Sequence, residues 1–402
     1  MKSIFLIALC AAAVAHAQAP EADAGTALVP DATMGPDATM GPDAGMPGPD
    51  AVVITVAEPV IEPTPWWRHF KPFGYAKVGV FYTLPTRDEQ IPGGNGGFRM
   101  AALRLGTIFQ PIEALEVVAS IEADAPMARS DDPTSGSRIV QMRDAYAEYT
   151  VCSGLLVRAG QFKAPFWAET LLADSQLPFI SRSVISDGYT APEFAGQREG
   201  LTLDRQVGLQ LSSRRLGGKW VGFKYALAVV NGNGANQLLN DNNSVAPVGR
   251  LELELFEHVT VGASGYYNAK SEGVRPNRLI SNNFGYGADF VAHALGFSVL
   301  VGYLGRSTSY PSTALGADTA MGILGQVSYS NTTTGLSGGV RFAQFDPSNA
   351  DPNDNVTEVT AMLGWQLKAA PLRVLLQYTH RGESPGVSVA NDGLDGMLQV
   401  TW

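Results

Sequence analysis

From residue 73 to the C-terminus, short segments alternate apolar residues with small or polar residues at every second position. In the last segment, LDGMLQVTW, Leu394, Leu398 and Trp402 fall on one face, and Asp395 and Gln399 fall on the other. Because successive side chains of a β-strand point to opposite faces, this pattern predicts strands with one apolar and one polar face. Sixteen such strands are predicted, at 73–83, 98–109, 115–124, 139–151, 155–162, 205–214, 220–230, 246–256, 258–269, 284–292, 295–305, 319–330, 334–345, 355–368, 371–381 and 392–402.

The connections between these strands alternate between long and short. Long polar loops, such as NGNGANQLLNDNN from Asn231, follow the odd-numbered strands, and tight turns, such as the one at Glu257, follow the even-numbered strands. The strand lengths suit a tilted crossing of a bilayer, which needs about 9 to 11 residues. The pattern predicts an all-β, 16-stranded antiparallel up-and-down transmembrane β-barrel with short periplasmic turns and long external loops. A soluble β-sandwich is the alternative fold, but it gives no reason for the alternation of loop lengths.

Aromatic residues on the apolar face gather near both ends of the predicted strands, as in the interfacial belts of outer-membrane barrels. No stretch of about 20 apolar residues follows the first few residues of the chain, and this excludes a helical membrane protein. The belt near the short turns comprises Phe109, Tyr149, Tyr329, Trp365 and Trp402, and the belt near the long loops comprises Tyr82, Tyr267, Tyr303 and Tyr378.

The N-terminal part of the chain differs in composition from the rest. Residues 1–17, MKSIFLIALCAAAVAHA, combine a lysine, a short apolar run and an A-x-A ending, which predicts a secretory signal peptide. Residues 18–65 are rich in Pro, Ala and Asp and predict a disordered periplasmic spacer before a barrel at 66–402. Cleavage would leave Cys152 as the single cysteine, so we expect no intrachain disulfide.

The charge distribution excludes one class of function. The chain has 28 basic and 38 acidic side chains, for a net charge of −10. More than half of this acidic excess lies in residues 1–70, which contain eight carboxylates and two basic side chains. No segment resembles the basic face that nucleic-acid binding requires.

The third external loop, at 163–200, is the longest in the predicted barrel. It begins KAPFWAETLLADSQLPFISRS and mixes large apolar residues with charges. A barrel of about 16 strands encloses a water-filled lumen, which an inward-folded loop could narrow. We therefore expect this loop to pack against the inner wall as a channel constriction, with an external surface loop as the alternative.

Three stretches carry a resemblance to a known family: RDAYAEY from Arg143, LLVRAGQFKAPF from Leu155 and DRQVGLQL from Asp204. Together they resemble the phosphate-selective porin O and P family of bacterial outer membranes, over roughly residues 70 to 402. The resemblance implies a 16-stranded barrel, a homotrimer, and passive passage of small solutes or ions through the outer membrane. The C-terminal strand with its final aromatic residue is similar to the signal read by the barrel-assembly machinery.

Selectivity for phosphate would require a positive constriction. By alternation, several carboxylates also face inward and are at least as numerous as the inward basic residues, so an unselective porin remains an alternative. The candidate constriction and lumen residues are Lys163, Arg182, Arg198, Arg104, Arg158, Arg250, Arg341, Arg373, Glu169 and Asp174.

Enzyme chemistry has little support in the sequence. No metal-ligand cluster is visible in the sequence, and the catalytic candidate is His380, which lies near Glu383 and Ser384. We therefore expect no enzyme activity and no cofactor. The predicted function is that of a porin for small hydrophilic solutes or ions, with anions such as phosphate among them. A non-conducting barrel that acts as an adhesin, receptor or structural anchor is the alternative.

Overall fold

The computed structural model describes residues 65–84, 96–124, 139–191, 196–237, 239–272, 276, 278–311, 316–351, 354–383 and 392–402. The predicted signal peptide and all but the last residue of the predicted spacer lie outside these ranges. None of the helices in the described part of the chain is long and apolar enough to span a membrane.

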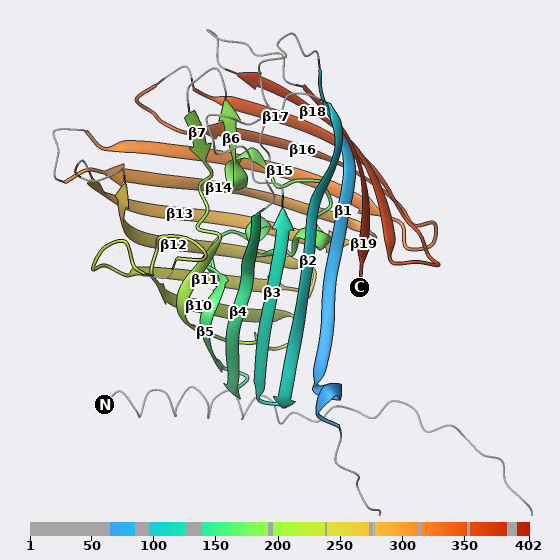
Figure 1. Cartoon of the computed structure of the whole chain (residues 1–402), viewed down its shortest axis with the longest axis horizontal. Helices are drawn as coiled ribbons and strands as arrows, with labels where there is room; N and C mark the ends of the chain where they lie inside the picture. Colours follow the sequence, from blue (N-terminus) through green and yellow to red (C-terminus); the bar gives the residue numbers. More distant parts are fainter. Residues whose placement is uncertain are drawn as a thin grey trace, which may run out of the picture.

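One large antiparallel sheet makes up most of the described chain (Figure 1). A short helix, η1 (Trp66–His69), precedes it, and a separate pair, β6 (Gly188–Ala191) and β7 (Gly196–Glu199), lies in the loop after β5. The strands of the large sheet are β1 (Phe70–Leu84), β2 (Gly97–Ile112), β3 (Leu115–Asp124), β4 (Ile139–Cys152), β5 (Leu155–Lys163), β8 (Arg205–Ser212), β9 (Leu216–Gly217), β10 (Val221–Val230), β11 (Ala246–Leu255), β12 (Val259–Glu272), β13 (Leu279–Ala294), β14 (Phe297–Ser309), β15 (Asp318–Ser330), β16 (Leu336–Asp346), β17 (Val356–Gln366), β18 (Leu372–Glu383) and β19 (Asp392–Thr401).

The sheet closes on itself. Strand β1 pairs on one side with β2, where Tyr75 lies opposite Arg104, and on the other side with β19, where Tyr75 lies opposite Thr401. The two-residue β9 continues the position of β8 beside β10, so the wall has sixteen strand positions. The prediction of a closed 16-stranded antiparallel barrel is confirmed. In Figure 1 the blue and green strands β1–β4 and the orange strands β14–β16 form opposite walls.

The two kinds of connection lie at opposite ends of the strands, as the alternation of loop lengths predicted. The β13–β14 turn is formed by Leu295 and Gly296, both with positive φ, which is the turn geometry that matches the twist of paired strands. The sequence predicts this turn at residues 293–294, two residues too early, because no glycine or proline precedes Gly296 to mark the end of the strand. Strand β13 therefore extends to Ala294.

Outward-facing residues of the wall are apolar and exposed. In β17, Val359, Leu363 and Trp365 are exposed, whereas Thr360 and Met362 on the other face are buried. A surface of this kind would be unusual in a soluble protein, but it is the expected lipid-facing band of a transmembrane barrel. Seven of the nine predicted belt residues are exposed, namely Tyr82, Tyr149, Tyr267, Tyr329, Trp365, Tyr378 and Trp402, and the other two, Phe109 and Tyr303, are partly buried.

A charge on the outer face should destabilise the barrel, because an arginine there has only hydrocarbon around it. We expect Leu251→Arg on β11 to lower the free energy of unfolding by up to about 2–4 kcal/mol, measured by denaturant unfolding in phospholipid vesicles. Thr260→Arg, on the inner face opposite Glu254, is the matched control and should have little effect. Equal losses in the two variants would contradict the assignment of faces.

Candidate channel constriction

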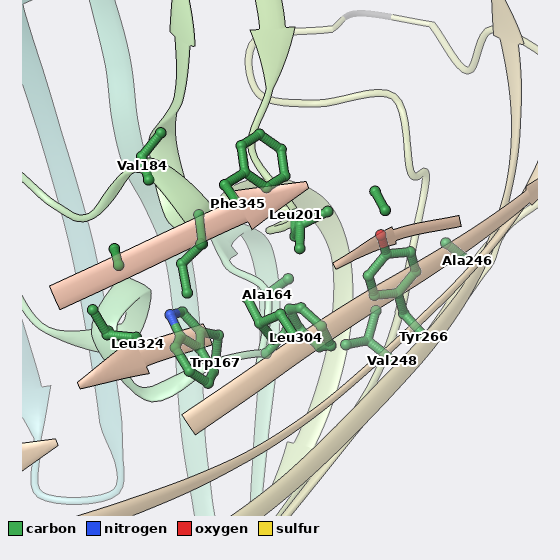
Figure 2. Close-up of a cluster of buried hydrophobic side chains, with 14 of the residues drawn as sticks. Ala164, Trp167, Val184, Leu201, Ala246, Val248, Tyr266, Leu304, Leu324 and Phe345 are labelled. Carbon is green, nitrogen blue, oxygen red and sulfur yellow. The ribbon is translucent and has the colours of Figure 1, made fainter. Parts of the chain in front are cut away.

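The chain between β5 and β8 is called here the inner loop, and the structure describes its residues 164–191 and 196–204. It contains the helices α2 (Ala168–Leu171), η3 (Asp174–Gln176) and α3 (Val184–Asp187). Its first apolar residues, Phe166 and Trp167, and Ile185 of α3 are almost fully buried. They belong to one cluster with inward-facing residues of β14–β17, including Leu304, Leu324, Phe345 and Val356 (Figure 2).

Small residues of the wall allow this close packing. A Cβ atom at Gly302 on β14 would lie 2.5 Å from Cη2 of Trp167, and one at Gly322 on β15 would lie 2.5 Å from Cγ2 of Ile185. Both distances are shorter than any van der Waals contact. Large side chains of the inner loop thus pack directly on glycines of β14 and β15, which lie more than 100 residues away in the sequence.

A buried carboxylate holds the loop together from within. Glu169, which is 1% exposed, accepts hydrogen bonds from the backbone N–H of Ser183 (3.0 Å) and from the hydroxyls of Ser183 and Ser186. The indole N–H of Trp167 donates to the Ser186 hydroxyl at 3.1 Å. A buried polar group is costly unless it is hydrogen-bonded, and these contacts satisfy the carboxylate.

The next part of the loop is bound through its backbone to side chains of the wall. Arg373 on β18 donates to the carbonyls of Leu177 (2.7 Å) and Pro178 (2.8 Å), and Arg341 on β16 donates to that of Ser181 (2.7 Å). Gln377 accepts the N–H of Ile180 at 2.9 Å, and Gln399 donates to the Ser175 carbonyl at 3.0 Å. The loop therefore crosses the lumen from β5 to the inner faces of β16, β18 and β19.

Asp174 ties the middle of the loop to the first strands. Its carboxylate forms an ion pair with Arg182 and accepts a hydrogen bond from the Tyr75 hydroxyl at 3.2 Å. Burial alone would raise the pKa of Asp174, but the charges of Arg182, Lys163 and Lys77 outweigh it and hold that pKa well below its usual range.

An open cavity of about 510 Å³ remains between the inner loop and the wall formed by β1–β5, β8, β10 and β11. Six basic residues line it, against three carboxylates, Glu116, Asp144 and Glu252. The basic residues are Arg104, Arg158, Lys163, Arg205, Lys224 and Arg250.

All four lining arginines are fixed by ion pairs. Arg104 and Arg205 share the carboxylate of Asp144, and Arg158 pairs with Glu148 at 2.6 Å. Arg250 donates to both carboxylate oxygens of Asp289, at 2.7 and 2.8 Å. Arg250 also pairs at 2.7 Å with Glu252, which lines the cavity, whereas Glu148, Asp289 and the Lys224 partner Glu254 are not part of the lining.

The residues singled out in the sequence have three different placements. Lys163, Arg104, Arg158 and Arg250 line the cavity. Arg341 and Arg373 bind the inner loop, Arg182 and Asp174 pair within it, and Glu169 is buried inside it. For Glu169 this differs from the expected exposure to the channel, because sequence composition does not show that two serines of the same loop enclose it. Arg198 lies on β7, and its side chain is outside the described part of the structure.

Sequence reasoning missed several residues at this site. Arg205 lines the cavity and pairs with Asp144, while Tyr75, Gln377 and Gln399 contact the inner loop. Alternation would have placed Gln377 and Gln399 on the inner face, but it gives no information about which loop atoms they bind. Their partners are 197 and 224 residues away in the chain.

Other candidate chemistry finds little support. His380 contacts Asp392, with Nδ1 2.9 Å from Oδ1, on an exposed part of the barrel rim. The side chains of Glu383 and Ser384 lie outside the described residues. Within the described ranges, no group of three or more His, Cys, Asp or Glu residues is arranged to hold a metal ion.

No protein-family model matches the chain, and no curated protein matches its sequence. Solved structures of similar fold include the anion-selective porin from Comamonas acidovorans, with 10% identity and a TM-score of 0.59, covering 83% of this chain and 99% of that one. The outer membrane channel DcaP of Acinetobacter baumannii has 13% identity and a TM-score of 0.56, with 83% and 97% covered. The trimer form of OmpT, an outer membrane protein of Vibrio cholerae, has 11% identity and a TM-score of 0.51, with 83% and 99% covered. The fold is therefore that of bacterial outer-membrane porins and channels.

The hydrogen bonds from Arg373 to the carbonyls of Leu177 and Pro178 should limit the motion of the inner loop. Arg373→Met removes two hydrogen bonds from a charged donor, each worth up to about 1.5–3 kcal/mol. We expect single-channel recordings of this variant to show increased current noise and frequent transitions between conductance levels. Lys368→Met, in the short turn after β17 and away from the loop, is the control. Equal current noise in Arg373→Met and in the control would contradict a role of Arg373 in holding the loop.

Proposed function

We propose that this protein is a porin of the bacterial outer membrane that allows passive diffusion of small hydrophilic solutes through its lumen. The main support is the placement of the inner loop. Its apolar residues pack on β12 and on β14–β19, and the side of the lumen at β1–β5, β8, β10 and β11 is left as a charged cavity of about 510 Å³. A barrel that served only as an anchor or adhesin would have no need for a loop that divides its lumen in this way.

The finer proposal is a preference for anions, with phosphate as one candidate. Six basic and three acidic side chains line the cavity, and the carboxylates that pair with Arg158, Lys224 and Arg250 include three that are not part of its lining. In a narrow passage the nearest charges have the largest effect on a solute. The resemblance to phosphate-selective porins and the anion-selective porin among the structures of similar fold both support this preference.

The proposal extends to assembly and location. A homotrimer is supported by the trimeric form of one structure of similar fold. We further propose that residues 1–17 are a signal peptide, that residues 18–65 form a periplasmic spacer, and that the barrel-assembly machinery inserts the chain. No cofactor and no enzymatic step belong to this function.

Conductance tests the proposal directly. The refolded protein in planar lipid bilayers should give steady, ohmic current steps in potassium chloride. Silence from a barrel whose β-sheet content and heat-modifiable mobility on a gel show correct folding would contradict the porin function and favour an adhesin, receptor or anchor.

The anion preference has its own test. Arg158→Gln removes one of the six lining basic residues and leaves Glu148 without its ion pair. We expect the reversal potential under a potassium chloride gradient to move toward cation preference. Lys368→Gln, outside the cavity, should leave the reversal potential unchanged. A wild-type channel that already prefers cations would contradict the anion preference and leave a general porin.

A further inference from the structure

The cavity lining has an apolar side as well as a basic one. Leu171 of α2 is 36% exposed and borders the cavity together with Pro165 and Ala173 of the same loop. Phe73 and Ile108 line it from the wall and are only partly buried. These side chains contrast with Trp167 and Phe166, which are at most 1% exposed because they attach the loop to the wall.

Arginine and aromatic side chains are also paired within this lining. The guanidinium carbon of Arg158 lies 4.3 Å from the centroid of the Tyr146 ring, and that of Arg104 lies 5.8 Å from the centroid of Phe73. Arg158 is the more accessible of the two arginines, with a side chain 24% exposed against 6% for Arg104. A cation beside an aromatic face offers a charged contact and an apolar contact at one place.

We propose that the cavity favours organic anions that carry an apolar body, such as aromatic carboxylates, over inorganic anions or small carboxylates of the same charge. This inference rests on the proposed porin function. The carboxylate would bind near Arg158 and Lys163, and the apolar body would contact Leu171, Phe73 and the ring of Tyr146.

Inorganic and aromatic anions differ in what they gain from an apolar lining. An inorganic anion is hydrated on all sides, and apolar side chains cannot replace the water that it loses in the cavity. An aromatic carboxylate removes both its own apolar surface and that of Leu171 from water. The volume of about 510 Å³ is within the range of small-molecule sites, so a molecule of this size fits with room to pass.

The experiment uses benzoate, acetate and phosphate as probes on the refolded full barrel in planar bilayers. Conductance in potassium chloride is recorded first, and each probe is then titrated to measure half-maximal reduction of the chloride current at neutral pH. Benzoate should reduce the current at a concentration about fivefold or more below that of acetate and of phosphate. A bilayer without protein controls for benzoate partitioning into lipid.

A pair of neighbouring variants tests the apolar contact. Leu171→Ser should bring the half-blocking concentration of benzoate close to that of acetate, because the apolar partner is gone. Leu172→Ser is the matched control, since Leu172 is 37% exposed but does not line the cavity, and it should retain the wild-type ratio. A loss of the ratio in both variants would indicate a general effect on the loop and overturn the assigned contact.

The outcomes separate this inference from the function on which it depends. An open channel that benzoate, acetate and phosphate block equally overturns the inference and leaves the porin function intact. An open channel that phosphate blocks best also overturns it and favours phosphate selectivity. A folded barrel that conducts nothing overturns both.

Discussion

The pairing of β1 with β19 is the constraint on which the rest of the structure depends. In hydrocarbon no water is present to bond free backbone N–H and C=O groups, so a sheet that crosses a membrane must have no open edge. A closed barrel widens as strands are added, and with sixteen of them the interior is too wide for wall side chains to fill. The hollow interior therefore follows directly from the way the backbone hydrogen bonds are satisfied.

The inner loop occupies part of that hollow interior. Its apolar residues pack against β12 and β14–β19, and its backbone is bound by Arg341, Arg373, Gln377 and Gln399. Arg341 and Arg373, which alternation places in the lumen, thus bind the loop. The other arginines predicted to face inward, Arg104, Arg158 and Arg250, line the cavity. The number of charges in the lumen is a poor guide to selectivity for this reason, because position relative to the loop decides which charges a solute meets.

The cavity combines two properties that come from different parts of the chain. Its basic groups belong mainly to the wall, where carboxylates such as Glu148 and Asp289 pair with them. Its exposed apolar residue Leu171 belongs to the inner loop, on the short helix that follows Trp167. Trp167, directly before this helix, packs on Gly302 of β14, so neighbouring residues of one segment attach the loop to the wall and border the cavity.

The sequence alone determined the barrel: the sixteen strands, their faces and the two kinds of connection were predicted correctly, with end points shifted by a few residues as at Ala294. Strand alternation and turn composition are local properties, and so the sequence displays them directly. Only the tertiary structure decided that Glu169 is enclosed by Ser183 and Ser186, that Arg373 binds Leu177 and Pro178, and that Arg205 shares Asp144 with Arg104. These contacts depend on the path of one loop across a closed barrel, and residues far apart in a chain carry no local pattern that shows which of them meet.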